Sequence, residues 1–179
     1  MQLDHQLLQL LDESHRQFFA AIDGLTEAQW VWKPAPGRWS IGETAEHIVL
    51  AEDRLFGGAR RAMAAPRNPD WETQTQGKTE LLLRVLPARQ GKAISPDPIL
   101  PHQALTRSQV EERFVQQRAA IVGFAQAPPP AWQEHTSVHP FPKFGTLNAY
   151  QWLLYVPLHT IRHNRQIAEV KATAGYPAG

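Results

Sequence analysis

Three histidines in this sequence have the arrangement that a metal ion requires. His159 and His163 are four residues apart in a segment that reads as helix, so both side chains lie on one helix face, about 6 Å apart. One more imidazole from a neighbouring helix, such as His47, would complete a three-ligand set with an open coordination position. Open positions are typical of catalytic metal sites. The pattern therefore favours a small metal-dependent enzyme.

The same spacing has a simpler interpretation, in which His159 and His163 are solvated or hydrogen-bonded on a polar helix face. Thr160 stands where the metalloprotease pattern H-E-x-x-H places its glutamate, so that class of enzyme is excluded. The remaining histidines show weaker patterns. His135 and His139 share the spacing, but Pro140 follows and the segment favours extended backbone, which would not bring the two rings together.

Composition limits the possible functions. The chain has 179 residues, 42% hydrophobic and 20% charged, which suits a single domain over residues 1–179. The net charge is +1 and the basic residues are scattered, so the sequence shows no basic patch that would bind nucleic acid. The absence of cysteine excludes disulfides and thiolate ligands. No signal peptide and no run of about 18 apolar residues is present, so we expect a cytoplasmic protein without a membrane partner.

Apolar periodicity and capping boxes predict an all-α fold of four long helices joined by one long crossover. The crossover spans residues 66–105, contains six prolines and one short helix over residues 81–86, and is long enough to let the flanking helices run parallel. Residues 131–145 read as irregular. Two weak points are expected inside helices, at Gly57–Gly58 and at Pro157, which should kink its helix. The long helices are predicted over residues 3–23, 41–65, 106–127 and 146–174.

Short motifs resemble those of the DinB/YfiT-like superfamily of metal-dependent enzymes. They occur in the family's order and span nearly the whole chain. One departure lies after the last histidine, where the family often has Arg-Gly-Gln and this chain has Asn164-Arg165-Gln166. The matching pieces are Trp32-Lys33-Pro34, Gly37-Arg38-Trp39-Ser40-Ile41, Ala45-Glu46-His47-Ile48, Leu158-His159 and His163-Asn164-Arg165-Gln166.

The resemblance implies a four-helix bundle of up-down-down-up topology and a metal held by His47, His159 and His163. Three imidazoles suit several ions, so zinc, nickel, iron and manganese all stay open. Relatives include hydrolases and thiol-dependent transferases and isomerases, which implies a small-molecule substrate and, as one option, a low-molecular-weight thiol. Relatives are often homodimers, so a homodimer is one expectation here.

Three further side chains near the histidines are candidate site residues. Glu43 lies one turn before His47 and could orient it or act as a base, although it is also the third helical residue of a capping box. Arg162 and Arg165 could contact an anionic substrate or thiol, although arginines on helices more often face water.

The sequence thus predicts a metal-dependent enzyme that activates water or a low-molecular-weight thiol, as a hydrolase or an S-transferase or isomerase. The alternative is a non-catalytic, stress-linked helical protein that binds a metal or a small molecule.

Overall fold

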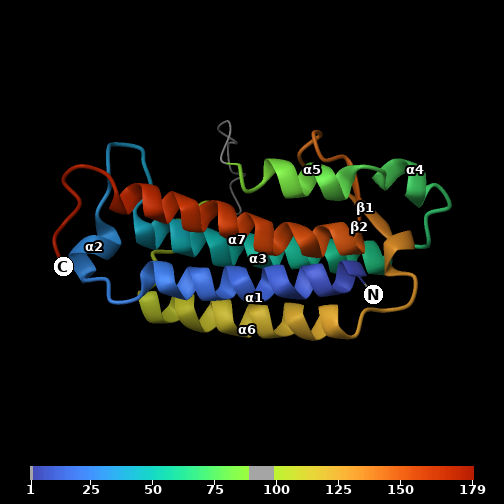
Figure 1. The fold of residues 1–179 in the computed structure, drawn as a ribbon, viewed down its shortest axis with the longest axis horizontal. Coiled ribbons are helices and arrows are strands. Elements are labelled where there is room, and N and C mark those ends of the chain that lie inside the picture. Colours follow the sequence, from blue (N-terminus) through green and yellow to red (C-terminus); the bar gives the residue numbers. More distant parts are fainter. Residues whose placement is uncertain (1, 89–98) are drawn as a thin grey trace.

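Four helices of 20 to 24 residues lie side by side and make up most of the described chain (Figure 1). The computed structural model describes residues 2–88 and 99–179. Helices α3 and α6 run in one direction, and α1 and α7 run in the other (Figure 1). The predicted all-α class is therefore confirmed. The four helices are α1 (Gln2–Ile22), α3 (Ile41–Ala64), α6 (Arg107–Gln126) and α7 (Ala149–Lys171).

Side-chain caps determine where these helices begin. Ser40 starts α3, and its hydroxyl accepts a hydrogen bond from the Glu43 amide while the Glu43 carboxylate accepts one from the Ser40 amide. Thr106 starts α6 in the same way, as predicted. A capping box at Thr26 starts the short helix α2 (Glu27–Val31). The predicted start of the last helix at residue 146 is wrong, because Asn148 is the cap of α7.

Residues 146–148 instead form strand β2 (Thr146–Asn148), which pairs antiparallel with β1 (Thr136–Val138). The sequence predicted irregular structure over residues 131–145, which include β1, and helix over residues 146–148, since strands of three residues are too short to show alternation. The loop that joins the two strands lies against α7. There the His139 ring stacks 4.9 Å from Trp152 and 5.3 Å from Tyr155, centroid to centroid.

The crossover after α3 contains two short helices, α4 (Trp71–Thr75) and α5 (Lys78–Val85). Helix α5 corresponds to the predicted short helix but begins three residues earlier, whereas α4 was not predicted. Helix α5 packs along α7 (Figure 1). The prediction for residues 89–98 lies outside the described residues. A single 3-10 turn, η2 (Trp132–Glu134), follows α6.

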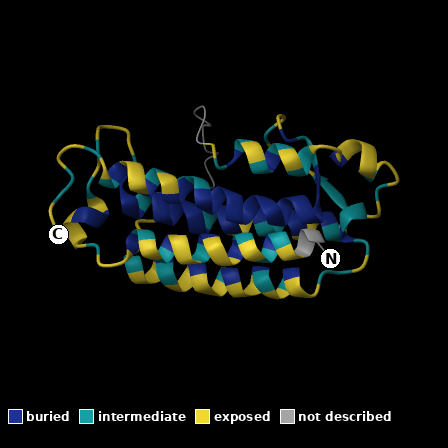
Figure 2. Ribbon diagram, viewed as in Figure 1, coloured by how far each residue is buried: buried dark blue, intermediate teal, exposed yellow. Residues whose placement is uncertain are grey.

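Burial differs strongly among the long helices. Helices α3 and α7 are buried along most of their length, while α1 and α6 alternate buried and exposed residues (Figure 2). Helix α7 is covered by α1, α3 and α5. The two helices that carry the three histidines of interest are therefore the most enclosed of the four. Within residues 2–88 and 99–179, no helix is both long and apolar enough to cross a membrane.

The glycine pair in α3 is a point of close packing. Helix α3 continues through Gly57 and Gly58, and a Cβ at Gly58 would overlap the Trp152 side chain. The absent side chain lets the indole approach the α3 backbone. Helix α3 is therefore uninterrupted at this pair, where tertiary packing offsets the low helix propensity of glycine, and the weak point stays a prediction. Helix α7 also continues through Pro157, and a kink there stays a prediction.

Candidate metal centre

The side chains of His47, His159 and His163 meet between α3 and α7. One nitrogen from each ring lies within 4.8 Å of the other two. The Nε2 atoms of His159 and His163 are 3.2 Å apart. Two imidazoles that bind one tetrahedral metal at bonds of 2.0–2.1 Å have nitrogens about 3.3 Å apart, so this pair already has ligand spacing. Three neutral nitrogen donors are a suitable set for a divalent transition metal.

The orientation of His47 is determined by the crossover. Its Nδ1–H donates to the backbone oxygen of Ile99 over 2.7 Å. A carbonyl oxygen can only accept, so Nδ1 carries the proton and Nε2 presents its lone pair to the site. Half-buried Trp39 also contacts the imidazole, with the ring centroids 4.8 Å apart.

His163 is oriented in the same manner by a residue on its own helix. Its Nδ1 donates to Oε1 of Gln166 over 3.0 Å. The amide nitrogen of Gln166 lies 3.4 Å from the Thr44 hydroxyl and so connects α7 to α3. Hydrogen bonds of this kind fix the tautomer of a metal-binding imidazole and raise its basicity.

His159 differs from the other two histidines. Since Nδ1 of His163 carries a proton, its Nε2 accepts, and the 3.2 Å contact is a hydrogen bond from Nε2–H of His159. Nδ1 of His159 is buried and has no hydrogen-bond partner within the described part of the chain. A metal ion bound by both Nε2 atoms would require the His159 proton to lie on Nδ1 instead. The ligand spacing of the two Nε2 atoms is the observation that best supports a fit.

All three rings are buried, with exposed fractions of 1% for His47, 8% for His159 and 7% for His163. Burial lowers the pKa of His47 to about 4, partly offset by the bond to Ile99. The pKa of His159 falls well below its usual value because of burial, with smaller contributions from His163 and His47. Both rings are therefore neutral near pH 7, the form that binds metal.

The carboxylate of Glu46 ties the end of the crossover to the same part of α3. It is 3% exposed, and it accepts hydrogen bonds from the backbone amides of Gln103 at 2.7 Å and Leu105 at 3.1 Å. Residues 99–105 are thus held by Glu46 and by its neighbour His47 together. Glu46 and Gln166 stood in the family motifs without an assigned role, and Ile99 had no signal in the sequence. The position of Gln166 three residues after His163 was a usable signal for its contact.

The other predicted site residues lie around this centre with partners of their own. Both carboxylate oxygens of Glu43 are engaged, one by the Ser40 amide and one by Lys33 at 2.7 Å. Arg162 and Arg165 donate to the backbone oxygens of Leu86 and Pro87, just after α5. Their catalytic or substrate-binding roles stay predictions.

His135 and His139 form hydrogen bonds with different partners. Nδ1 of His135 lies 2.8 Å from the Ala65 carbonyl, whereas Nδ1 of His139 accepts a hydrogen bond from the Phe141 amide. His139 therefore carries its proton on Nε2, and burial lowers its pKa to about 4. Its ring stacks on Tyr155, whose ring in turn lies 6.1 Å from that of His159.

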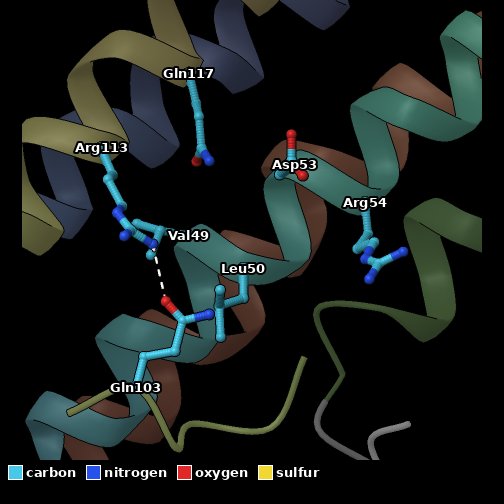
Figure 3. A pocket seen from close by; sticks show the side chains of 7 residues that line it. All are labelled: Val49, Leu50, Asp53, Arg54, Gln103, Arg113 and Gln117. Atoms are coloured by element: carbon cyan, nitrogen blue, oxygen red, sulfur yellow. Dashed lines mark hydrogen bonds between the residues drawn. The ribbon is translucent and has the colours of Figure 1, made fainter. Parts of the chain in front are cut away.

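A pocket of about 270 Å³ between α3 and α6 is a separate feature (Figure 3). Arg113 of α6 reaches across it to Gln103, with a hydrogen bond of 3.1 Å. The other polar residues that line it are Asp53 and Arg54 of α3 and Gln117 of α6. None of the three clustered histidines lines it.

The fold and the histidine cluster define a helical protein with a candidate three-histidine metal centre. The model of the DinB superfamily matches residues 10–167, so the chain belongs to this superfamily. The chain is also similar to the uncharacterized protein YuaE of Bacillus subtilis (strain 168), with 24% identity over 173 residues that cover 92% of this chain and 96% of YuaE. No solved structure gives a significant match.

Proposed function

We propose that the protein is a metal-dependent enzyme of the DinB kind, in which His47, His159 and His163 hold a divalent ion. The observation that carries the proposal is the convergence of three buried imidazoles, two of them with Nδ1–H engaged by carbonyl oxygens. We also propose that the four long helices form the up-down-down-up bundle of that superfamily. Zinc, nickel, iron and manganese are all compatible with this ligand set.

The chemistry follows from the metal and its surroundings. When bound, a divalent ion lowers the pKa of a coordinated water or thiol and polarises a substrate oxygen. The chain's own residues hold the ligands in place and exclude water, since the three rings are buried. The reaction proposed is attack of water or a low-molecular-weight thiol on a small electrophile, as a hydrolase or an S-transferase or isomerase.

Charged residues near the centre are assigned supporting roles in this proposal. Arg162 and Arg165, which both contact the end of α5, are proposed to hold an anionic group of the substrate or thiol. Glu43 is proposed to act as a base only when its ion pair with Lys33 is broken. We further propose a homodimer that binds neither nucleic acid nor membrane, and light scattering would test the dimer.

Metal analysis of the purified protein tests the proposal. We expect near-stoichiometric metal in the wild type, or after reconstitution with zinc or nickel, and none in His47→Ala or His163→Ala. His5→Ala, a change at an exposed histidine of α1, should retain the metal. Turnover of thiol-acceptor or ester substrates should then vanish on chelation and return with the ion. A folded wild type that takes up no metal would refute the proposal.

The enclosed position of the three histidines supports a second candidate, a non-catalytic metal-binding protein. Exposed fractions of 1 to 8% leave little room for substrate in this conformation. Water exchange on the manganese-loaded protein separates the two candidates. Fast exchange, seen as high proton relaxivity, would favour the enzyme, and a closed ion without exchangeable water would favour the binding protein.

A further inference from the structure

A second polar cluster lies inside the four long helices, next to the candidate metal centre. Its members are buried, and every long helix contributes at least one of them. We call it the polar node, and it consists of Ser14 from α1, Glu52 from α3, Arg118 from α6, and Thr160 and Asn164 from α7.

Arg118 is the centre of the node. One terminal nitrogen donates to the Leu11 carbonyl at 2.8 Å and to the Ser14 hydroxyl at 2.7 Å. The other donates to the carboxylate of Glu52 and, at 3.2 Å, to the hydroxyl of Thr160. The side chains of the ion pair are only 3% and 0% exposed. The guanidinium therefore joins α1, α3 and α7 to α6.

Thr160 links this ion pair to the helix that carries two of the three histidines. Its hydroxyl donates to Oε1 of Glu52 over 2.7 Å and accepts from Arg118. One turn later, the Asn164 amide donates to the Ser14 carbonyl at 3.4 Å. Thr160 and Asn164 directly follow His159 and His163 in sequence. The side of α7 that carries the threonine and the asparagine is therefore rotated by about 100° around the helix axis from the side that carries the two histidines.

Stability alone does not explain this cluster. Buried ion pairs are often matched or exceeded in stability by apolar residues of similar volume. Oε2 of Glu52, Nε of Arg118 and Oδ1 of Asn164 are also buried without hydrogen-bond partners among residues 2–88 and 99–179, which adds to the cost. What the node provides is direction, because the bonds of Thr160 to Glu52 and Arg118, and that of Asn164 to Ser14, form only at one rotation of α7.

From this geometry we infer that the node is a positioning device for the metal ligands: the Glu52–Arg118 pair, acting through Thr160, sets the rotation of α7 that aims His159 and His163 at His47. A rotation of 20° would move a side-chain atom about 6 Å from the axis by roughly 2 Å. Metal sites tolerate deviations of about 0.2 Å in bond length. The inference rests on the proposed function. It assigns a positioning role to Glu52, Arg118 and Thr160, which contact none of the proposed metal-binding nitrogens.

Zinc affinity of matched variants tests the inference, measured by competition with a chromophoric chelator under conditions where each protein is shown to be folded. Thr160→Val removes the hydroxyl at nearly constant volume, and the double change Glu52→Leu with Arg118→Met removes the ion pair. We expect each to weaken zinc binding by about 10-fold, the lower end of the effect of residues that hydrogen-bond a metal ligand, because these residues act on the ligands only through α7.

Two controls separate positioning from loss of stability. Thr160→Ser retains the hydroxyl, and Ile121→Val removes a methyl group from a fully buried residue of α6. Both should bind zinc close to wild-type affinity. A folded double variant or Thr160→Val protein with unchanged affinity would overturn the inference.

A metal-independent measurement keeps this outcome distinct from failure of the proposed function. In the metal-free protein, the hydrogen bond between His159 and His163 should give characteristic ring ¹⁵N shifts by NMR. Thr160→Val should change these shifts and Thr160→Ser should preserve them. If the wild type takes up no metal, the proposed function fails and the ring shifts alone decide; unchanged shifts in Thr160→Val would then reject the positioning role.

Discussion

Nδ1 of His47 lies 2.7 Å from the backbone oxygen of Ile99, which joins the second long helix to a crossover residue 52 positions later. The contact assigns the proton of the imidazole to Nδ1 and leaves Nε2 for the centre. Because the acceptor is a main-chain atom, no side-chain substitution removes it directly. Its counterpart on α7, the bond from His163 to Gln166, is open to mutation.

Replacing Gln166 should therefore weaken metal binding without removing a ligand. Gln166→Leu takes away the acceptor of the His163 Nδ1–H, and we expect a loss of about 10 to 100-fold in zinc affinity. Gln166→Glu keeps an oxygen acceptor in place and should retain much tighter binding. The measurement is a competitive zinc titration. Equal affinities for the Leu and Glu variants would show that the hydrogen bond does not matter.

Glu43→Gln separates the capping role of Glu43 from the proposed catalytic one. Glutamine completes a capping box as glutamate does, and the lost ion pair with half-exposed Lys33 contributes little. The free energy of unfolding should therefore change by less than about 1 kcal/mol. If Glu43 acts as a base, turnover by the metal-loaded enzyme should fall by about 10² or more. Unchanged turnover would leave Glu43 with its structural role alone.

Adjacent glycines in α3 should respond in opposite ways to alanine. Gly57→Ala gains helix propensity and should stabilise the protein by about 0.5–1 kcal/mol, because its Cβ meets only the end of the Arg61 side chain, at 3.3 Å. Gly58→Ala should destabilise it by about 1–3 kcal/mol, since the new methyl group overlaps Trp152. Chemical denaturation of both variants checks this. A stabilising Gly58→Ala would contradict the described packing.

Acid should destabilise the metal-free protein between pH 6.5 and pH 4. Buried His47 and His139 have their pKa lowered to about 4, so in this range the unfolded chain binds protons that the folded chain does not. Each ring contributes about 3 kcal/mol of stability above pH 6.5, and this contribution is lost as the pH falls to 4. Within this range the free energy of unfolding changes by up to about 1.4 kcal/mol per pH unit for each ring.

The variant His139→Phe tests the share of one ring. It should flatten the pH dependence of the unfolding free energy by up to about 1.4 kcal/mol per pH unit in that window. Phe144→Leu alters the same aromatic cluster without removing a titrating group and should leave the slope as in wild type. An unchanged slope in His139→Phe would mean that this ring titrates normally in the folded state.

Local chemistry made much of this protein predictable from its sequence. The starts of α3 and α6 follow from capping boxes at Ser40 and Thr106, whose bonds close within three residues. Helical spacing placed His159 and His163 on one face, and family likeness added His47. These features depend on neighbours in the chain, so periodicity and motif order were enough to identify them.

Long-range packing decided the rest. The partners Ile99 and Glu52 are far from His47 and Arg118 in sequence, and nothing in local patterns pairs a main-chain oxygen with an imidazole or a buried carboxylate with a guanidinium. The three-residue strands were too short to leave a periodic signal, and nothing in the sequence indicated that Trp152 packs against Gly58. Sequence thus determined which histidines could meet, whereas the tertiary structure determined how they are aimed, because orientation depends on contacts that form only when distant helices pack.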